Sequence, residues 1–159
     1  MIDGRTAIRR TKPSAPARWL IDHGYLARGD SVLDYGCGHG ADAAAYGWRK
    51  FDPVHHPEPV YDRALFVYCG YVLNVLAERD ERNLVIERCL ALAKEGAFFA
   101  VRRDLRQASQ RSKRGTWQGN IVLVGADLVH VSSGFDIYYV SKGHRYVGSV
   151  VAEPRKGRR

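Results

Sequence analysis

The chain carries the sequence Val32-Leu33-Asp34-Tyr35-Gly36-Cys37-Gly38-His39-Gly40, in which a short apolar run ends at an acid and leads into three alternately spaced glycines. Glycine lacks a Cβ atom, so it permits a positive φ and lets a ligand approach the main chain closely. A turn of this kind between a strand and a helix is where nucleotide-type cofactors bind in doubly wound α/β folds. The sequence therefore predicts a strand, a tight turn and a cofactor beside it. A glycine turn without any ligand is the alternative.

A second acid stands at the interval at which a βαβ unit delivers a ribose-binding carboxylate. Asp52, in Phe51-Asp52-Pro53, comes 18 residues after Asp34, close to the typical interval of about 20 residues. Pro53 ends regular structure, because proline has a fixed φ and no backbone N–H to donate. The two acids therefore predict neighbouring strand ends that share one ligand.

The glycine pattern is Asp-x-Gly-x-Gly-x-Gly and not GxGxxG, and it resembles the first motif of class I S-adenosylmethionine-dependent methyltransferases. In that family the acid and the loop amides hold the amino acid end of the cofactor, and the acid after the next strand binds both ribose hydroxyls. The resemblance implies S-adenosylmethionine as the cofactor, with Asp34 and Asp52 in these two roles. The other cofactor contacts expected at this site are Tyr35, Gly36, Cys37, Gly38, Pro53, Tyr68, Cys69 and Gly70.

Three further sequence segments narrow the resemblance to a smaller group of proteins. With the two acid motifs, the chain is similar to the methyltransferase-like proteins associated with DNA phosphorothioation systems, and to small phage and bacterial relatives, over roughly residues 8 to 145. In that group the link after the second acid is also short. The strings that carry this similarity are Arg10-Thr11-Lys12-Pro13-Ser14, Gly70-Tyr71-Val72-Leu73-Asn74-Val75-Leu76 and Val101-Arg102-Arg103-Asp104.

The order of apolar runs and breaks predicts a Rossmann-like α/β fold of the class I methyltransferase type, with a mostly parallel sheet and a C-terminal antiparallel hairpin. A helix capped by Ser14 and ended by Gly24 should precede the first strand, at 31–35. Only nine residues separate Asp52 from Asp62, so the sheet should be reduced after its second strand. The remaining expected elements are helices at 41–46 and 78–94, strands at 64–69 and 97–103, a polar loop at 104–119, and strands at 121–124, 128–131 and 135–141. In the long helix Leu84, Val85, Ile86, Cys89, Leu90 and Leu92 should be buried, and Glu95-Gly96 should end it.

Length and composition are those of one soluble domain. The chain has 159 residues, of which 45% are hydrophobic and 26% charged. No apolar run approaches the about 20 residues that cross a bilayer, and no secretory signal is recognised, so a cytoplasmic protein is expected. Three cysteines without a CxxC pair suggest neither disulfides nor a zinc site. The sequence divides into a basic arm at 1–13, a methyltransferase domain at 14–152 and a basic tail at 153–159, and it leaves the oligomeric state open.

The chain is strongly basic, with 25 Lys and Arg against 17 Asp and Glu and a net charge of +8. A positive field of this size attracts polyanions, so DNA or RNA is the expected partner and methyl acceptor. Basic runs also occur on solvated loops, where they serve solubility. The charge gathers at 5–12, at 102–114 and at 155–159, and Trp117 after the second run offers a stacking face or an anchor to the core.

Ligands of doubly wound folds bind beyond the carboxyl ends of the strands, and this rule gives Tyr71, Arg102 and Asp104 as the catalytic candidates. DNA amino-methyltransferases usually carry an NPPY-like tetrad where this chain has Tyr68-Cys69-Gly70-Tyr71, which puts a standard exocyclic-amine mechanism in doubt. Asn74 lies in an apolar run and needs hydrogen-bond partners, so it is expected to fix a loop.

His55 and His56 lack partners at metal-ligand spacing, so no metal site is predicted. Two other functions stay open. One is a non-catalytic S-adenosylmethionine-binding protein with a regulatory or host-interaction role. The other is a methyltransferase that acts on a small molecule or a protein side chain.

Overall fold

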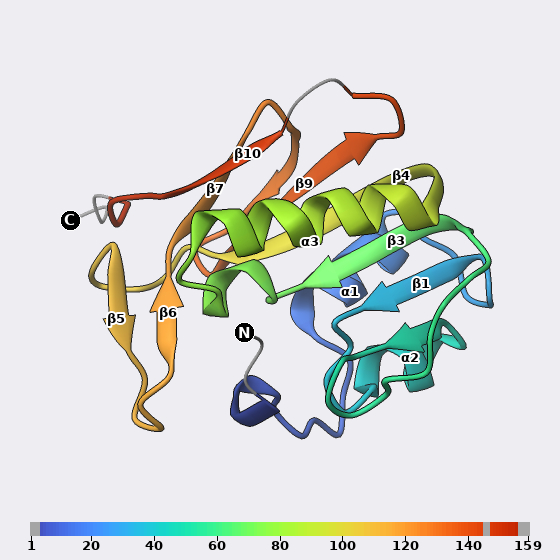
Figure 1. The fold of residues 1–159 in the computed structure, drawn as a ribbon, viewed down its shortest axis with the longest axis horizontal. Coiled ribbons are helices and arrows are strands. Elements are labelled where there is room, and N and C mark those ends of the chain that lie inside the picture. The colour runs from blue at the N-terminus through green and yellow to red at the C-terminus, as the bar shows by residue number, and fades with distance from the viewer. Residues whose placement is uncertain (1–3, 145–146, 156–159) are drawn as a thin grey trace.

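A six-stranded sheet in the order β2-β1-β3-β4-β9-β8 forms the centre of the computed structural model, which describes residues 4–144 and 147–155 (Figure 1). Strands β2, β1, β3 and β4 run parallel, β9 pairs antiparallel with β4, and β8 pairs antiparallel with β9. The predicted Rossmann-like fold with a C-terminal antiparallel hairpin is confirmed. The strands are β1 (Val32–Tyr35), β2 (Arg49–Phe51), β3 (Ala64–Gly70), β4 (Ala93–Arg102), β8 (Asp127–Val131) and β9 (Phe135–Ser141).

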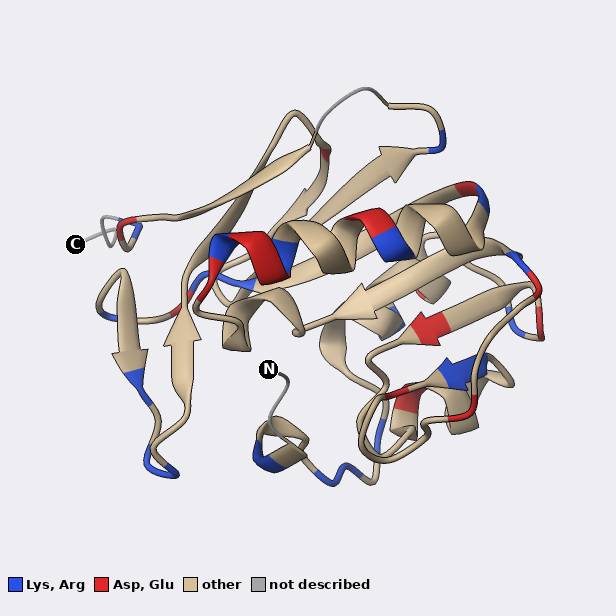
Figure 2. Cartoon of the chain, viewed as in Figure 1, with Lys and Arg blue, Asp and Glu red and all other residues tan. Residues whose placement is uncertain are grey.

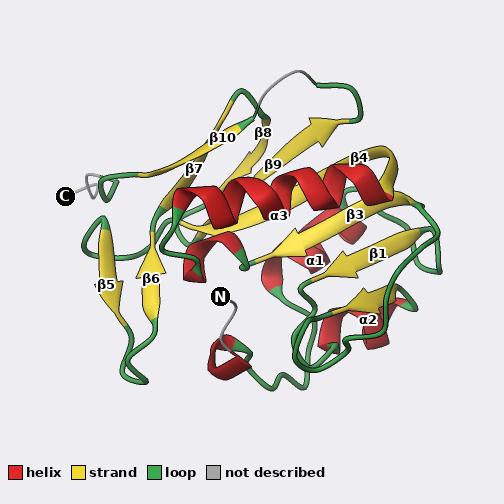
Figure 3. Cartoon of the chain, viewed as in Figure 1, coloured by secondary structure: helices red, strands yellow, loops and turns green. Residues whose placement is uncertain are grey.

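Helices cover both faces of this sheet. Helix α3 (Arg79–Leu92) lies in front of it in Figure 3, and α1 (Ala15–Asp22) and α2 (Ala41–Tyr46) lie behind it. Side chains alternate between the two faces along each strand. In β1, Leu33 therefore joins the core under α3, whereas Val32 joins the core under α1 and α2. The two cores hold the carboxyl ends of the central strands at a fixed spacing.

The predicted start of α1 is confirmed. Ser14 is its N-cap, and the Ser14 hydroxyl accepts a hydrogen bond from the backbone N–H of Ala17 at 3.4 Å. Helix α2 has the predicted bounds. In α3 one predicted core position is wrong, because Leu84 is 44% exposed while Arg82 is buried in its place. The Arg82 guanidinium donates to the backbone oxygens of Leu76 and Ala77, which satisfies it inside the fold.

The predicted end of α3 is also wrong. The helix ends at Leu92 and β4 begins at once at Ala93, so Gly96 is a strand residue and not a helix cap. A Cβ atom on Gly96 would lie 2.4 Å from the Tyr139 hydroxyl and 2.5 Å from the Val140 carbonyl oxygen. Glycine is required there because β9 approaches β4 closely.

The segment 104–119 contains a hairpin where the sequence predicted a loop. Strands β5 (Ser109–Arg111) and β6 (Trp117–Gly119) pair antiparallel, and Trp117 packs against the core. Another two-stranded sheet pairs β7 (Ile121–Val124) with β10 (Gly148–Val151), a strand that the sequence did not predict. The packing of Trp117 favours its anchoring role.

The predicted reduction of the sheet after its second strand is confirmed, because residues 53–63 contain no helix and no named strand. This segment turns back on itself through a bridge between Asp52 and His56. Within the ranges that the structure describes, no helix is long and apolar enough to cross a membrane.

Parts of the predicted N-terminal arm and C-terminal tail contact the rest of the fold. Gly4–Thr6 forms a short 3-10 helix, η1, beside the carboxyl ends of β1 and β3 (Figure 1). At the other end the Arg155 guanidinium pairs with the buried Asp136 carboxylate, which ties residue 155 to β9. The rest of the predicted tail, 156–159, lies outside the described residues, as do residues 1–3.

Candidate functional site

A cavity of about 390 Å³ lies at the carboxyl ends of β1, β3 and β4. Its walls come from the glycine turn after β1, the segment after β3, the end of β4, strand β6 and the N-terminal segment. Of the predicted site residues, nine line it: Asp34, Gly36, Cys37, Gly38, Asp52, Gly70, Tyr71, Arg102 and Asp104. The topology thus brings together residues that are up to 70 positions apart in the chain.

The glycine turn is a rigid corner. The N–H groups of Gly36 and Cys37 donate to the Phe51 carbonyl at 2.7 and 3.0 Å, and the N–H of Gly38 donates to the Asp52 carboxylate at 2.9 Å. The N–H of Gly40 donates to the Cys37 carbonyl at 2.9 Å. These four amides are therefore already hydrogen-bonded within the protein, to the Phe51 and Cys37 carbonyls and to the Asp52 carboxylate.

The need for glycine at this corner has a steric reason. Gly36 has φ of +77°, and a Cβ atom there would lie 2.4 Å from Cγ2 of Val72. Gly38 has φ of +57°, and its Cβ would lie 3.2 Å from the Ala7 Cβ. The glycines let the segment after β3 and the N-terminal segment approach the turn.

Asp34 is the most strongly perturbed group in the cavity wall. Asp34 as a residue is 3% exposed, and among the residues that the structure describes none donates a hydrogen bond to its carboxyl. Burial, followed by the neighbouring carboxylates of Asp42 and Asp52, raises the pKa of Asp34 well above its usual range. A buried carboxyl without a partner is costly for the fold, and such groups cluster at functional sites.

The other two acids of the cavity are bound within the protein. The Asp52 carboxylate accepts from the N–H groups of Gly38, Val54 and His55, each at 2.9 Å. The Asp42 carboxylate accepts from the N–H and the hydroxyl of Ser14 at 2.6 and 2.7 Å. Asp52 therefore ties the glycine turn to the segment after β2, and Asp42 ties α2 to the start of α1.

Tyr71 has the one positive φ of a residue other than glycine within the described ranges, at 60°. Its N–H donates to the Ala100 carbonyl at 2.9 Å, which holds this conformation. Strained residues of this kind persist where the surrounding structure fixes them, often at functional sites. Burial raises the pKa of the Tyr71 hydroxyl, so the phenol is neutral at physiological pH.

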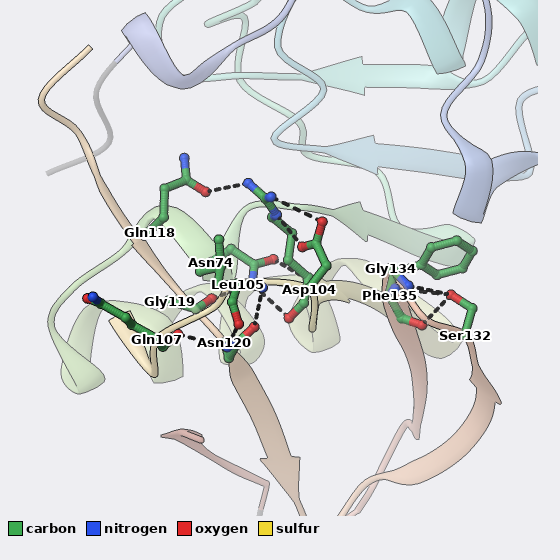
Figure 4. A network of polar contacts seen from close by, with 11 residues as sticks. Asn74, Asp104, Leu105, Gln107, Gln118, Gly119, Asn120, Ser132, Gly134 and Phe135 are labelled. Carbon is green, nitrogen blue, oxygen red and sulfur yellow. Dashed lines mark hydrogen bonds and ion pairs between the residues drawn. The ribbon is translucent and has the colours of Figure 1, made fainter. Parts of the chain in front are cut away.

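A polar network orients the far end of the cavity (Figure 4). The Arg102 guanidinium donates to both carboxylate oxygens of Asp104, at 2.7 and 3.2 Å, and to Oε1 of Gln118 at 3.4 Å. Asn74 accepts from the Arg102 N–H at 2.8 Å and donates to the Gly119 carbonyl at 2.7 Å. Asn74 therefore has the hydrogen-bond partners that the sequence predicted, and it fixes the end of β4 against β6.

Four predicted cofactor contacts do not line the cavity: Tyr35, Pro53, Tyr68 and Cys69. Pro53 is exposed, and the other three are buried in the cores. Tyr68 lies behind the cavity, where its hydroxyl contacts the Ser14 hydroxyl at 3.2 Å. It also explains Gly70, because a Cβ there would lie 2.3 Å from that hydroxyl. At the cavity wall itself, burial raises the pKa of the Cys37 thiol to about 12, so Cys37 is no thiolate nucleophile at neutral pH.

Several residues of the cavity wall were missed by the sequence prediction. They are Thr6, Ala7, Ile8, Arg10, Ser14, His39, Asp42 and Gln118. The string Arg10-Thr11-Lys12-Pro13-Ser14 was a signal for the N-terminal residues, because it belonged to the resemblance. His39 lies in the quoted glycine stretch, which was its signal. The remaining residues gave none, since their place depends on how distant segments pack.

Two histidines of this region lie against each other, with the rings of His39 and His55 centred 4.1 Å apart and tilted by 41°. Desolvation, with the neighbouring His55 and Arg9, lowers the pKa of His39. Across the described residues, no three His, Cys, Asp or Glu side chains are grouped as metal ligands.

The architecture and the position of the cavity define a class of fold, that of S-adenosylmethionine-dependent methyltransferases. Magnesium protoporphyrin IX methyltransferase from Synechocystis PCC 6803 with bound SAM is similar in structure, with a TM-score of 0.50 and 14% identity over 81% of this chain and 77% of that chain. The same protein with bound SAH gives a TM-score of 0.51 and 13% identity, with 81% of each chain covered. N-methyltransferase NodS from Bradyrhizobium japonicum WM9, in complex with SAH, gives 0.50 and 11% over 80% and 86% of the two chains. No family model matches the chain, and no curated protein matches its sequence.

Proposed function

We propose that this protein is an S-adenosylmethionine-dependent methyltransferase. The observation that carries the proposal is the buried Asp34 carboxyl, which faces the cavity at the end of β1 without a hydrogen-bond donor among the described residues. The amino acid end of S-adenosylmethionine carries an ammonium group, which is a donor of the kind that Asp34 lacks. The similar structures with bound SAM or SAH support the same cofactor.

The other residues of the wall also fit this cofactor. Asp52 stands at the end of β2, 6% exposed, where the ribose hydroxyls are bound in the resembling family. Asp34, Asp42 and Asp52 make this end of the cavity acidic, which suits a cationic sulfonium. The cavity volume of about 390 Å³ is within the usual range for small-molecule sites, about 300 to 1,000 Å³.

The chemistry supplied by the bound cofactor is a methyl group on a positively charged sulfur, ready for in-line displacement. The protein then has to orient an acceptor and exclude water from the cavity. Tyr71, Arg102 and Asp104 stand at the end of the cavity that we assign to the acceptor. Asp104 is the carboxylate that takes a proton there, and its hydrogen bonds with Arg102 hold both oxygens in a fixed position.

The experiment for this proposal has two parts. Isothermal titration with S-adenosylhomocysteine should show saturable binding to one site. Methyl-labelled S-adenosylmethionine, incubated with the protein and with nucleic acid, protein and metabolite fractions, should label one fraction. No binding of either compound would refute the proposal.

The finer hypothesis is that the acceptor is DNA or RNA. The tip of the β5–β6 hairpin carries the exposed Lys113 and Arg114, and Figure 2 shows this basic tip. The Arg114 guanidinium donates to the Arg5 carbonyl at 3.2 Å, so the basic tip contacts the segment that covers the cavity. The resemblance to phosphorothioation-associated proteins points the same way. The similar structures include magnesium protoporphyrin IX methyltransferase, whose name points to a porphyrin and gives this hypothesis no support.

Salt dependence tests the nucleic-acid hypothesis. Affinity for an oligonucleotide should fall steeply between 50 and 200 mM salt, because Lys and Arg contacts release counterions. A Lys113→Gln, Arg114→Gln variant should reduce the slope of that dependence. Salt-independent binding, or label only in the metabolite fraction, would contradict the hypothesis.

A non-catalytic cofactor-binding protein is the second candidate, and one observation favours it. Asp104, the acid of the cavity end assigned to the acceptor, already accepts hydrogen bonds from Arg102 at both carboxylate oxygens, so neither oxygen is free of a partner. Binding of S-adenosylhomocysteine without labelling of any fraction would support this candidate.

A further inference from the structure

The amino acid end of S-adenosylmethionine bears two opposite charges, an ammonium and a carboxylate. The proposed function assigns the ammonium to Asp34 and leaves the carboxylate without a partner. The amides of the glycine turn do not fill this role, because those of Gly36, Cys37, Gly38 and Gly40 donate within the protein. The carboxylate therefore needs a donor from another part of the wall.

Two cationic side chains line the cavity, Arg10 and Arg102. Arg102 is committed to Asp104, with an Nε to Oδ1 distance of 2.7 Å. Arg10 has no carboxylate partner among residues 4–144 and 147–155. Its guanidinium lies over the Tyr71 ring, with Cζ 5.7 Å from the ring centroid. A guanidinium on an aromatic face keeps its N–H groups available for a carboxylate, which it can bind through two hydrogen bonds.

Arg10 is held at this position because the protein anchors the segment on both sides of it. On the N-terminal side, the carbonyls of Gly4 and Arg5 lie within hydrogen-bond distance of His55 Nε2 and Arg114, at 3.5 and 3.2 Å. On the C-terminal side, Ser14 is bound through its N–H and hydroxyl to Asp42. The anchors come from three separate parts of the chain, so the position of Arg10 is built into the fold.

We propose that Arg10 binds the carboxylate of the cofactor's amino acid end, so that the N-terminal segment completes the cofactor site. Within the described part of the chain, the cavity then offers one acid without a hydrogen-bond donor, Asp34, and one cation without a carboxylate partner, Arg10, to a ligand end that carries one charge of each sign. This inference rests on the proposed function. It adds a residue of the segment that the sequence had set apart as a basic arm.

Paired ligands test this assignment without an activity measurement. S-adenosylhomocysteine contains the amino acid end, whereas 5′-methylthioadenosine shares the adenosine and the sulfur but lacks it. In calorimetric titrations, Arg10→Gln should weaken S-adenosylhomocysteine binding by about 10- to 100-fold, the loss expected for a charge-assisted hydrogen bond. Its affinity for 5′-methylthioadenosine should change less than about twofold, and Arg10→Lys should retain part of the lost affinity.

Lys12→Gln is the matched control, because Lys12 is exposed in the same segment and lies outside the cavity wall. It removes the same charge and should leave both affinities unchanged. Three results would overturn the inference: unchanged S-adenosylhomocysteine binding by Arg10→Gln, an equal loss for both ligands, or an equal loss in Lys12→Gln. If the wild-type protein binds neither ligand, the proposed function itself fails and this inference falls with it.

Discussion

Replacing Asp34 with asparagine should make the ligand-free protein more stable and its cofactor binding weaker. The carboxyl is buried, close to Asp42 and Asp52, and within the described residues it accepts no hydrogen bond. Burial and these neighbours raise the pKa of Asp34, so the folded state binds a proton more tightly than the unfolded chain does. Stability therefore falls as pH rises above the unfolded pKa, until the pH reaches the folded pKa.

The size of this effect has an upper limit at pH 7. The cost of burying the charge stops near about 4 kcal/mol, because protonating a carboxyl whose unfolded pKa is near 3.9 costs that much at pH 7. Asparagine has no charge to bury. For a chain of this size, 1 kcal/mol shifts the Tm by about 2 to 4 °C, so Asp34→Asn should raise the Tm by up to about 16 °C.

Thermal unfolding followed by circular dichroism between pH 4 and pH 8 measures this difference. The gain in Tm should be largest at neutral pH and should become small near pH 4, because the wild-type carboxyl is then protonated in the folded state and about half protonated in the unfolded chain. Calorimetry at pH 7 should show about 10-fold or greater weakening of S-adenosylhomocysteine binding, because the partner of the ammonium loses its charge.

Asp42→Asn is the control. Because the Asp42 carboxylate accepts hydrogen bonds from Ser14, neutralising it should lower the Tm of the protein. The reasoning is refuted if Asp34→Asn lowers the Tm at pH 7 or if its gain is the same at pH 4.

Three further changes have defined outcomes. Gly36→Ala should lower stability by about 1 to 3 kcal/mol, because its φ is +77° and the new Cβ would lie 2.4 Å from Val72; Val72→Ala should restore the part due to the clash, and the Tm of the double variant measures it. Asn74→Ala should lower the free energy of unfolding, measured with denaturant, by about 2 to 4 kcal/mol, because the Arg102 N–H and the Gly119 carbonyl lose their partner. An unchanged free energy of unfolding would show that Asn74 does not stabilise this region. Asp52→Ala should abolish measurable S-adenosylhomocysteine binding and lower the Tm as well, because three N–H groups lose their acceptor; unchanged calorimetric binding would show that the ribose lies elsewhere.

The sequence predicted the central fold because its signals are local. Ser14 caps a helix, the glycines after β1 permit positive φ, and Pro53 stops a strand, whatever the rest of the chain does. The order of apolar runs then gave the parallel sheet and its reduced link. The predictions for Gly96 and for 104–119 were wrong because the deciding contacts are distant. Gly96 meets β9 about 43 residues later in the chain, and the β5–β6 hairpin packs through Trp117 on the core.

The sequence by itself determined that an acid and three glycines stand at the end of the first strand, and that a second acid follows one βαβ interval later. Tertiary structure alone decided which of these groups are available to a ligand. Folding directs the turn amides to Phe51 and Asp52, leaves the Asp34 carboxyl without a donor among the described residues, and sets Arg10 over Tyr71. The physical reason is that a hydrogen bond depends on the distance and direction between two groups, and residues far apart in the chain acquire both only when the chain packs.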